Sequence, residues 1–217
     1  MDIEQARYNM IEQQIRPWEV LDPDVLELLL KVKREEFVPV PYRSLAFVDM
    51  EIPLGHGEQM WSPKLEARCL QELQLKRTDT VLEVGTGSGY FTALLASLAG
   101  HVRSVDCVAE FVAEASRKFV GQGFGNISQE TGDGACGWPS QGPYDAIVMT
   151  GSLPLLPEAL PKQLKPGGRL FVILGEGPIM QATLITCVAP GSYRRTVLFE
   201  TLVKALQHAA QPDRFVF

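Results

Sequence analysis

Three alternating glycines directly after a short apolar run constrain the fold of this chain more than any other feature. Residues 81–90 read Val-Leu-Glu-Val-Gly-Thr-Gly-Ser-Gly-Tyr. The run Thr80–Val84 is typical of a buried parallel strand, and residues 88–98 are typical of a helix. Glycines between a strand and a helix let the chain turn tightly and let a ligand approach the backbone. The segment therefore predicts a ligand-binding turn at the carboxyl end of a central strand in an open α/β sheet.

The chain after residue 61 alternates helix and strand patterns. Expected helices cover residues 63–73, 88–98, 109–120 and 156–164, and expected strands cover residues 80–84, 102–106, 127–130, 144–149 and 169–174. Residues 180–188 and 195–202 have the alternation of an antiparallel pair that closes a sheet. Five strand–helix steps followed by a hairpin predict a doubly wound, mostly parallel, seven-stranded sheet with helices on both faces.

The first sixty residues have a different character from the rest. Residues 3–15 read as a polar helix, and Asp22 followed by Pro23 predicts the N-cap and first turn of a second helix. Later parts of this region read as irregular or extended chain. We therefore divide the protein into an N-terminal helical extension, residues 1–61, that packs on the core, and a main α/β domain, residues 62–217.

Composition narrows the classes of function. The 217 residues carry a formal net charge of −6, which disfavours a protein that coats nucleic acid. No apolar run approaches the roughly 20 residues that span a membrane, and the N-terminus does not resemble an export signal. The cysteines form no CxxC pair, which argues against a metal site; they are Cys69, Cys107, Cys136 and Cys187. These features predict a cytoplasmic protein with reduced thiols that binds neither nucleic acid, membrane nor metal.

The glycine spacing discriminates between nucleotide-binding loops. A dinucleotide fingerprint places its third glycine three residues after the second, whereas Gly89 follows Gly87 by only two positions. A phosphate-binding loop needs Lys followed by Ser or Thr after its last glycine, and none occurs here. The spacing, with Glu83 before the first glycine, resembles instead the first motif of S-adenosylmethionine-dependent methyltransferases. The resemblance implies cofactor-binding roles for Glu83, Gly85, Thr86, Gly87, Ser88 and Gly89.

Two later segments extend the expected cofactor site. Asp106 ends the next strand, roughly 20 residues beyond the turn, where a carboxylate can accept hydrogen bonds from both ribose hydroxyls. Cys107 follows it directly. Asp133 and Gly134 belong to a turn after the third strand, where methyltransferases often place an acidic residue against the adenine amino group; an ordinary Asp-Gly turn is the alternative. We expect all four residues to contact the cofactor.

Across nearly its whole length the chain resembles the protein-L-isoaspartate (D-aspartate) O-methyltransferase family. The matching segments are residues 32–39, 52–57, 81–90, 132–134, 137–139, 144–150, 163–164, 167–170 and 214–216. The family implies a class I, Rossmann-like methyltransferase fold, S-adenosylmethionine as cofactor, and methyl transfer to the carboxylate of an isoaspartyl residue in a damaged protein or peptide. A carboxylate is already ionised at neutral pH, so such an enzyme needs positioning more than a general base.

One segment departs from the family pattern. The family has a Gln-Thr-Ile-Ser run whose serine contacts the substrate carboxylate, then one residue, then proline. When Pro63 is taken as the anchor, Trp61 stands at the serine and Gln59 at the threonine, and Ser62 is the only hydroxyl. We expect Ser62 to be catalytic, with Gln59, Met60 and Trp61 lining the substrate side.

Other functions stay open at this point. The substituted run beside an intact glycine turn is compatible with a small-molecule acceptor. It also fits a divergent cofactor-binding protein that acts by interaction or regulation. A nicotinamide dehydrogenase is disfavoured by the glycine spacing.

Overall fold

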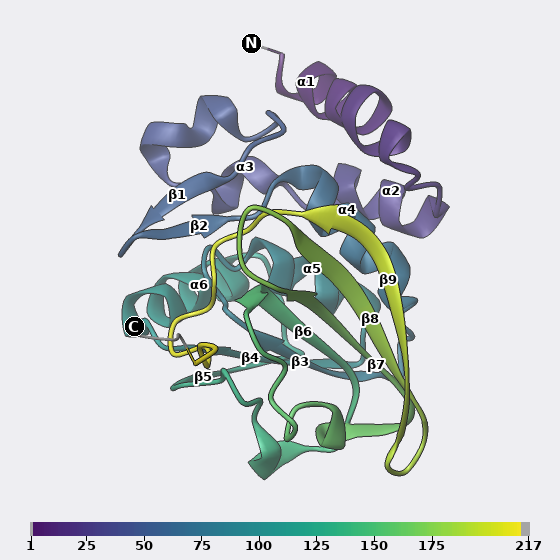
Figure 1. Ribbon diagram of the computed structural model, residues 1–217. Helices are drawn as coiled ribbons and strands as arrows, with labels where there is room; N and C mark the ends of the chain where they lie inside the picture. Colours follow the sequence, from purple (N-terminus) through teal and green to yellow (C-terminus); the bar gives the residue numbers. More distant parts are fainter. Residues whose placement is uncertain (1, 214–217) are drawn as a thin grey trace, which may run out of the picture.

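The computed structural model describes residues 2–213 and is built around a seven-stranded sheet (Figure 1). In sequence order its strands are β3 (Thr80–Val84), β4 (His101–Asp106), β5 (Ile127–Thr131), β6 (Tyr144–Leu153), β7 (Leu164–Leu174), β8 (Met180–Ala189) and β9 (Ser192–Thr201). Across the sheet they lie in the order β5-β4-β3-β6-β7-β8-β9. Strands β3 to β7 pair in parallel, whereas β8 is antiparallel to both β7 and β9. The predicted fold class, a mostly parallel seven-stranded sheet with flanking helices, is therefore confirmed.

The helices begin close to the positions that the sequence indicates, except for one of four residues after residue 33, which was not predicted. They are α1 (Ile3–Met10), α2 (Pro23–Lys31), α3 (Arg34–Phe37), α4 (Pro63–Leu73), α5 (Tyr90–Leu98) and α6 (Ala109–Gly121). Asp22 caps α2, because its side chain accepts hydrogen bonds from the backbone N–H groups of Asp24 and Val25. Beyond α1 the chain continues as a π-helical turn, Ile11–Ile15, and a 3-10 turn, Arg16–Trp18. Within residues 2–213 none of the helices has the length and apolarity that crossing a membrane requires.

The helix expected over residues 156–164 is wrong. This segment forms turns and one short 3-10 helix, Pro161–Gln163. Pro161 lies inside the expected helix, where it has no backbone N–H to donate and its ring would clash with the preceding turn. The side chain of Gln163 instead joins this segment to a neighbouring loop, accepting from the Trp138 N–H at 2.7 Å and donating to the Cys136 carbonyl at 2.8 Å.

The two faces of the sheet carry different coverings. Alternate strand residues such as Val81 and Val148 join a large apolar cluster with side chains from α1, α2, α4, α5 and α6. Their neighbours, such as Leu82 and Ile147, join a smaller cluster that includes Leu160 from the turn segment. Because the helices share one cluster, they lie together on one side of the sheet, above it in Figure 1. The expectation of helices on both faces is therefore wrong, since turns and short 3-10 helices cover the second face. The N-terminal helices thus pack into the same core as the central strands.

A small hairpin and the C-terminal segment lie beside the sheet. The hairpin consists of β1 (Ile52–Gly55) and β2 (Glu58–Met60), which are antiparallel. The chain after β9 runs along the end of β6, where Ser152 donates its backbone N–H to the Lys204 carbonyl and accepts from the Leu206 N–H, both at 3.0 Å. This path brings residues distant in sequence to the carboxyl ends of the central strands.

Candidate functional site

One cavity at the carboxyl ends of the central strands gathers most of the residues that the sequence singled out. Its walls include Gln59, Met60, Trp61, Gly85, Thr86, Gly87, Ser88, Asp106, Cys107, Asp133 and Gly134. Three expected residues, Ser62, Glu83 and Gly89, do not line it. The position agrees with the general location of ligand crevices in open α/β sheets. A ligand in this cavity would touch the glycine turn, the ends of β4 and β5, and the β2 hairpin together.

The glycine turn fits its surroundings only because it lacks side chains. Gly85 has a φ of +103°, and a Cβ there would lie 2.0 Å from Thr150 Oγ1. That hydroxyl donates to the carbonyls of Val84 and Gly85, both at 2.9 Å, so it is held in place. At Gly89, with a φ of +83°, a Cβ would lie 2.9 Å from Ala115 on α6. Gly89 therefore lets α5 approach α6 closely, and Gly85 leaves the room that the Thr150 hydroxyl occupies.

Glu83 lies beneath the turn and not on the cavity wall. Its carboxylate is fully buried and accepts from the Thr92 hydroxyl at 2.5 Å and the Ser104 hydroxyl at 2.6 Å. The Thr86 hydroxyl lies 2.6 Å from the same Ser104 oxygen. Burial raises the pKa of Glu83 to about 8, although both hydroxyl bonds oppose the shift. Glu83 thus supports the turn through a buried hydroxyl network.

Asp106 connects the end of β4 to the glycine turn. Its Oδ2 accepts from the Gly87 N–H and its Oδ1 from the Val108 N–H, both at 2.9 Å. The side chain is almost fully buried, and this burial raises its pKa. Each carboxylate oxygen has a second lone pair, so both can still accept a hydrogen bond from a ligand in the cavity. Next to it, the Cys107 thiol donates to Gln207 Oε1 at 3.4 Å.

The turn after β5 supplies a third part of the cavity wall. Asp133 is exposed, and its Oδ1 accepts from the Ala135 N–H at 2.9 Å, which closes a local turn. Gly134 is buried, and a Cβ there would lie 2.8 Å from a methyl group of Val84. The turn is therefore pressed against β3, which brings Asp133 to the same cavity as Asp106.

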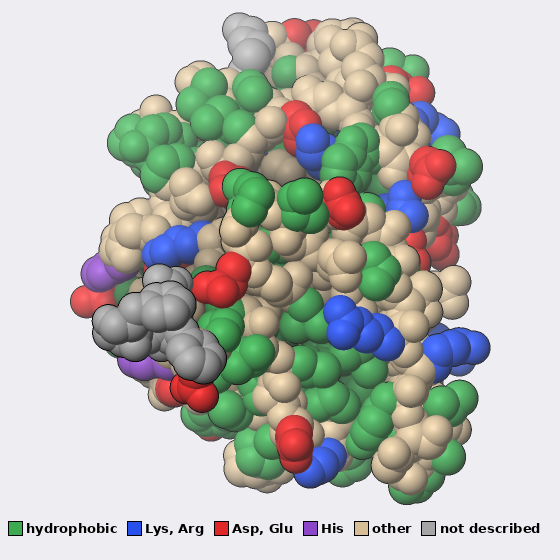
Figure 2. All heavy atoms as spheres, in the orientation of Figure 1, with side chains coloured by type: hydrophobic (Ala, Val, Ile, Leu, Met, Phe, Trp, Pro, Cys, Tyr) green, Lys and Arg blue, Asp and Glu red, His purple; other side chains and the backbone are tan. Residues whose placement is uncertain are grey.

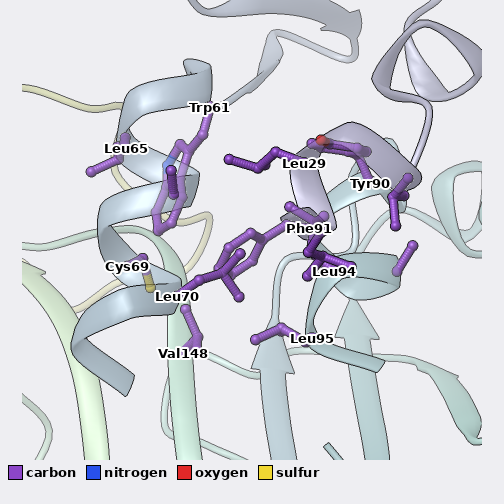
Figure 3. Packing of buried hydrophobic residues seen from close by; sticks show 14 of the residues in the cluster. Leu29, Trp61, Leu65, Cys69, Leu70, Tyr90, Phe91, Leu94, Leu95 and Val148 are labelled. Carbon is purple, nitrogen blue, oxygen red and sulfur yellow. The ribbon is translucent and has the colours of Figure 1, made fainter. Parts of the chain in front are cut away.

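Trp61 is fixed in the wall by a buried ion pair. Its ring packs against Phe91 at 5.5 Å and Phe171 at 6.2 Å between centroids, and Figure 3 shows it lying between α4 and α5. The Trp61 carbonyl accepts from Arg34 Nη2 at 2.6 Å. Arg34 also donates to the carboxylate of Glu66, and both of these side chains are about 1% exposed. The indole is consequently a fixed part of the cavity wall, and its buried Nε1 has no hydrogen-bond partner among the described residues.

Ser62 lies outside the cavity, at the N-cap of α4. Its side chain makes no capping hydrogen bond, while its carbonyl accepts from the Leu65 N–H at 3.1 Å. The residue lines a neighbouring hollow, and Glu51 and Val203 line both spaces. The structure thus separates Ser62 from Gln59, Met60 and Trp61, which the sequence analysis grouped with it.

Several cavity residues were not found from the sequence. Thr150 lies near the carboxyl end of β6, the strand next to β3, and directly after the strand expected over residues 144–149, so its position was a usable signal. Lys204 and Gln207 reach the cavity only through the path of the C-terminal segment, for which no local pattern exists. Both donate to the Glu58 carboxylate, Gln207 at 2.7 Å, and thereby tie the β2 hairpin to that segment. Glu66 and Glu51 likewise depend on packing between distant segments.

Comparison with known sequences gives one consistent family. A profile of the protein-L-isoaspartate(D-aspartate) O-methyltransferase family matches residues 5–202. A protein-L-isoaspartate O-methyltransferase of Rhodopseudomonas palustris is 42% identical over 166 residues, which is 76% of each chain. One of Myxococcus xanthus is 44% identical over 157 residues, covering 72% of this chain and 74% of that one. The match thus extends over most of both the chain and its relatives.

Known structures agree in fold. A crystal structure described as a protein-L-isoaspartate O-methyltransferase from Plasmodium falciparum, in complex with S-adenosyl-L-homocysteine, superposes with a TM-score of 0.80. The superposition covers 95% of this chain and 99% of that one at 20% identity, a level at which it shows the fold. A second protein-L-isoaspartate O-methyltransferase structure gives a TM-score of 0.76 at 25% identity, covering 94% of this chain and 65% of that one.

Proposed function

This chain belongs to the protein-L-isoaspartate (D-aspartate) O-methyltransferase family, and we propose that it transfers a methyl group from S-adenosylmethionine to the carboxylate of an isoaspartyl residue in a protein or peptide. The single observation that carries the proposal is the cavity in which the glycine turn, Asp106 and Asp133 meet. We further propose that the reaction takes place in the cytoplasm, in keeping with four cysteines that are all free.

The residues of the cavity fit the proposed cofactor. Gly85 and Gly87 line the cavity without side chains, and the two oxygens of Asp106 can accept from a pair of vicinal hydroxyls. Asp133 would meet the amino group of an adenine, with Gly134 and Cys107 beside the nucleoside. Bound there, S-adenosylmethionine would supply a methyl group on a sulfonium sulfur, which is a good leaving group.

The remaining task of the protein is to position the acceptor and exclude water. An ionised carboxylate is already a nucleophile, so no side chain has to remove a proton from it. Rigid packing of Trp61 against Phe91 closes one wall of the cavity with apolar surface. Fixed orientation of two reactants is worth about 7 kcal/mol or more of the barrier in favourable cases. We propose that Gln59 and Met60 line the acceptor side with Trp61, and that the hydroxyl of Ser62 acts from the adjoining hollow.

A paired binding and turnover measurement tests the function. Purified protein is titrated with S-adenosylhomocysteine by calorimetry and assayed with radiolabelled S-adenosylmethionine on an isoaspartyl peptide, with the matching aspartyl peptide as control. The proposal predicts saturable binding and methyl transfer to the isoaspartyl peptide alone. Transfer to neither peptide would refute the assigned acceptor, and absence of binding would refute the cofactor as well.

A second function is favoured by one observation, the indole of Trp61 at the family's serine position. This substitution would suit a cofactor-binding protein that acts on another acceptor, including a small molecule, or that acts through interaction. Tight cofactor binding without turnover of any isoaspartyl peptide is the result that would support this alternative.

A further inference from the structure

A second hollow opens directly beside the cofactor cavity. It lies where β9 ends, between the 3-10 turn at Trp18 and the start of α4. Glu51 and Val203 line both spaces, so the hollow adjoins the cavity. We call it the flank groove and define it by Trp18, Met50, Glu51, Lys64, Glu200 and Leu202. Any acceptor chain that enters the cavity from this side has to pass along it.

The flank groove has an excess of negative charge. Its one lysine, Lys64, bonds to Asp49 at 2.6 Å, and its ammonium lies 4.5 Å from the centre of the Trp18 ring. Within residues 2–213, neither Glu51 nor Glu200 has an ion-pair partner. Glu51 is partly buried, so its charge is poorly solvated and a cation placed beside it would be stabilised.

The groove also offers apolar contact and free backbone. Met50 is 37% and Leu202 60% exposed, so both present hydrophobic surface. Among the described residues, β9 pairs only with β8, and the backbone of its outer edge is therefore available to an extended chain. Figure 2 looks onto this part of the surface, where acidic, basic and hydrophobic side chains meet near the end of β9.

We propose that the flank groove binds the residues next to the acceptor in an extended peptide, and that it selects a segment with a Lys or Arg beside an apolar residue. The inference rests on the proposed function and adds the sequence preference of the substrate. The occupant follows from two observations: the groove adjoins the cavity, and it carries unpaired negative charge beside the place where an anionic acceptor would lie. A neighbouring cation would offset both that anion and the unpaired carboxylate of Glu51.

Peptide binding and turnover test the proposal together. Each peptide in the set contains one isoaspartyl residue and differs from the others at a single position. That position is one of the two residues before or the two residues after the acceptor, and it carries Lys, Gln or Glu. Their Kd is measured by calorimetry in the presence of S-adenosylhomocysteine, and their kcat/KM is measured with S-adenosylmethionine. For at least one position, the Kd of wild-type protein should be about tenfold lower for the Lys peptide than for the Glu peptide. This ratio combines one modest attraction, for Lys, with one modest repulsion, for Glu.

Variants assign the preference to the groove. Glu51→Gln should reduce the Lys-to-Glu ratio, with each peptide measured relative to the Gln peptide, to about threefold or less. Glu158→Gln is the matched control, because it removes the same charge from a 94% exposed side chain that lines neither the groove nor the cavity. The control should keep the full ratio.

The outcomes distinguish this inference from the proposed function. Charge preference in Kd without turnover would uphold the flank groove and refute the isoaspartyl reaction. Turnover without charge preference, or a preference that Glu51→Gln leaves intact, would overturn the groove alone. Failure of every peptide to bind would overturn both. Sedimentation tests one further outcome. If the wild-type protein is a dimer and Leu202→Glu is a monomer, the groove binds a second copy of the chain, and the proposal is overturned.

Discussion

Replacing Asp106 by alanine should weaken the binding of S-adenosylmethionine far more than it weakens the fold. In the proposed complex the two carboxylate oxygens accept hydrogen bonds from the ribose hydroxyls. In the free protein they accept from Gly87 and Val108 at 2.9 Å. Hydrogen bonds to a charged group contribute about 1.5 kcal/mol each at the lower end, so two amount to about 3 kcal/mol. The Kd should therefore rise by about two orders of magnitude.

The same substitution has a structural cost that the assay must separate from binding. Alanine leaves the Gly87 and Val108 N–H groups without their partner, at a cost of about 1 to 3 kcal/mol in unfolding free energy. Asp145→Ala is a matched control, because Asp145 also accepts from a backbone N–H, that of Thr80 at 2.8 Å, but at the amino ends of the strands. Both variants should lose stability, and only Asp106→Ala should lose affinity.

The measurement is calorimetric titration with S-adenosylhomocysteine at a temperature where circular dichroism shows each variant to be folded. A folded Asp106→Ala protein whose Kd lies within about threefold of wild type would refute the ribose assignment, since that change corresponds to less than 1 kcal/mol. An equal loss of affinity in Asp145→Ala would show that general destabilisation, and not a lost contact, weakens binding.

Three further substitutions have definite expected outcomes. Gly85→Ala should lower the Tm by several degrees and abolish cofactor binding, because its Cβ would lie 2.0 Å from Thr150 Oγ1 at a φ of +103°; near-normal calorimetric binding would contradict the account of the turn. Ser62→Ala should reduce kcat on isoaspartyl peptides by about tenfold, which corresponds to the loss of one hydrogen bond to the acceptor. The Tm and the cofactor Kd should not change, because the hydroxyl makes no capping bond; unchanged turnover would show that the hydroxyl does not participate. Glu83→Gln should stabilise the protein at pH 8 relative to wild type but much less at pH 5. Wild-type Glu83 has its pKa raised to about 8 in the folded state, so its contribution to stability is present below its ordinary pKa and is lost as the pH rises towards 8. Thermal denaturation that shows the same Tm difference at both pH values would contradict the buried-carboxyl account.

The central strands and the turn were predictable because local sequence and long-range packing agree there. The short, β-branched run Thr80–Val84 forms a buried strand with the expected bounds. Helix α4 begins at Pro63, the residue at which the sequence pattern places its start. The helix expected over residues 156–164 is wrong because Pro161, which has no backbone N–H, breaks a helix despite the apolar residues around it. Pro161 was therefore a usable signal against a helix in this segment.

The cofactor side of the site was easier to predict than the acceptor side. Gly87 follows β3 and Asp106 ends β4, so their proximity results from the parallel pairing of these two strands. Glu66 and Lys204 reach the cavity from α4 and the C-terminal segment, and their positions depend on how those segments pack. Ser62 illustrates the same limit, because its rotation out of the cavity follows from the start of α4 and not from its spacing in the sequence. Residues 214–216, which resemble the family in sequence, lie outside the residues that the structure describes.

A crystal structure with bound S-adenosylhomocysteine tests the central claim most directly. The account predicts ligand density in the cavity between the Gly85 turn and the β2 hairpin, with both ribose hydroxyls within hydrogen-bonding distance of Asp106 and the adenine beside Asp133. Density elsewhere on the protein, or a ribose that does not contact Asp106, would contradict the assignment of this cavity.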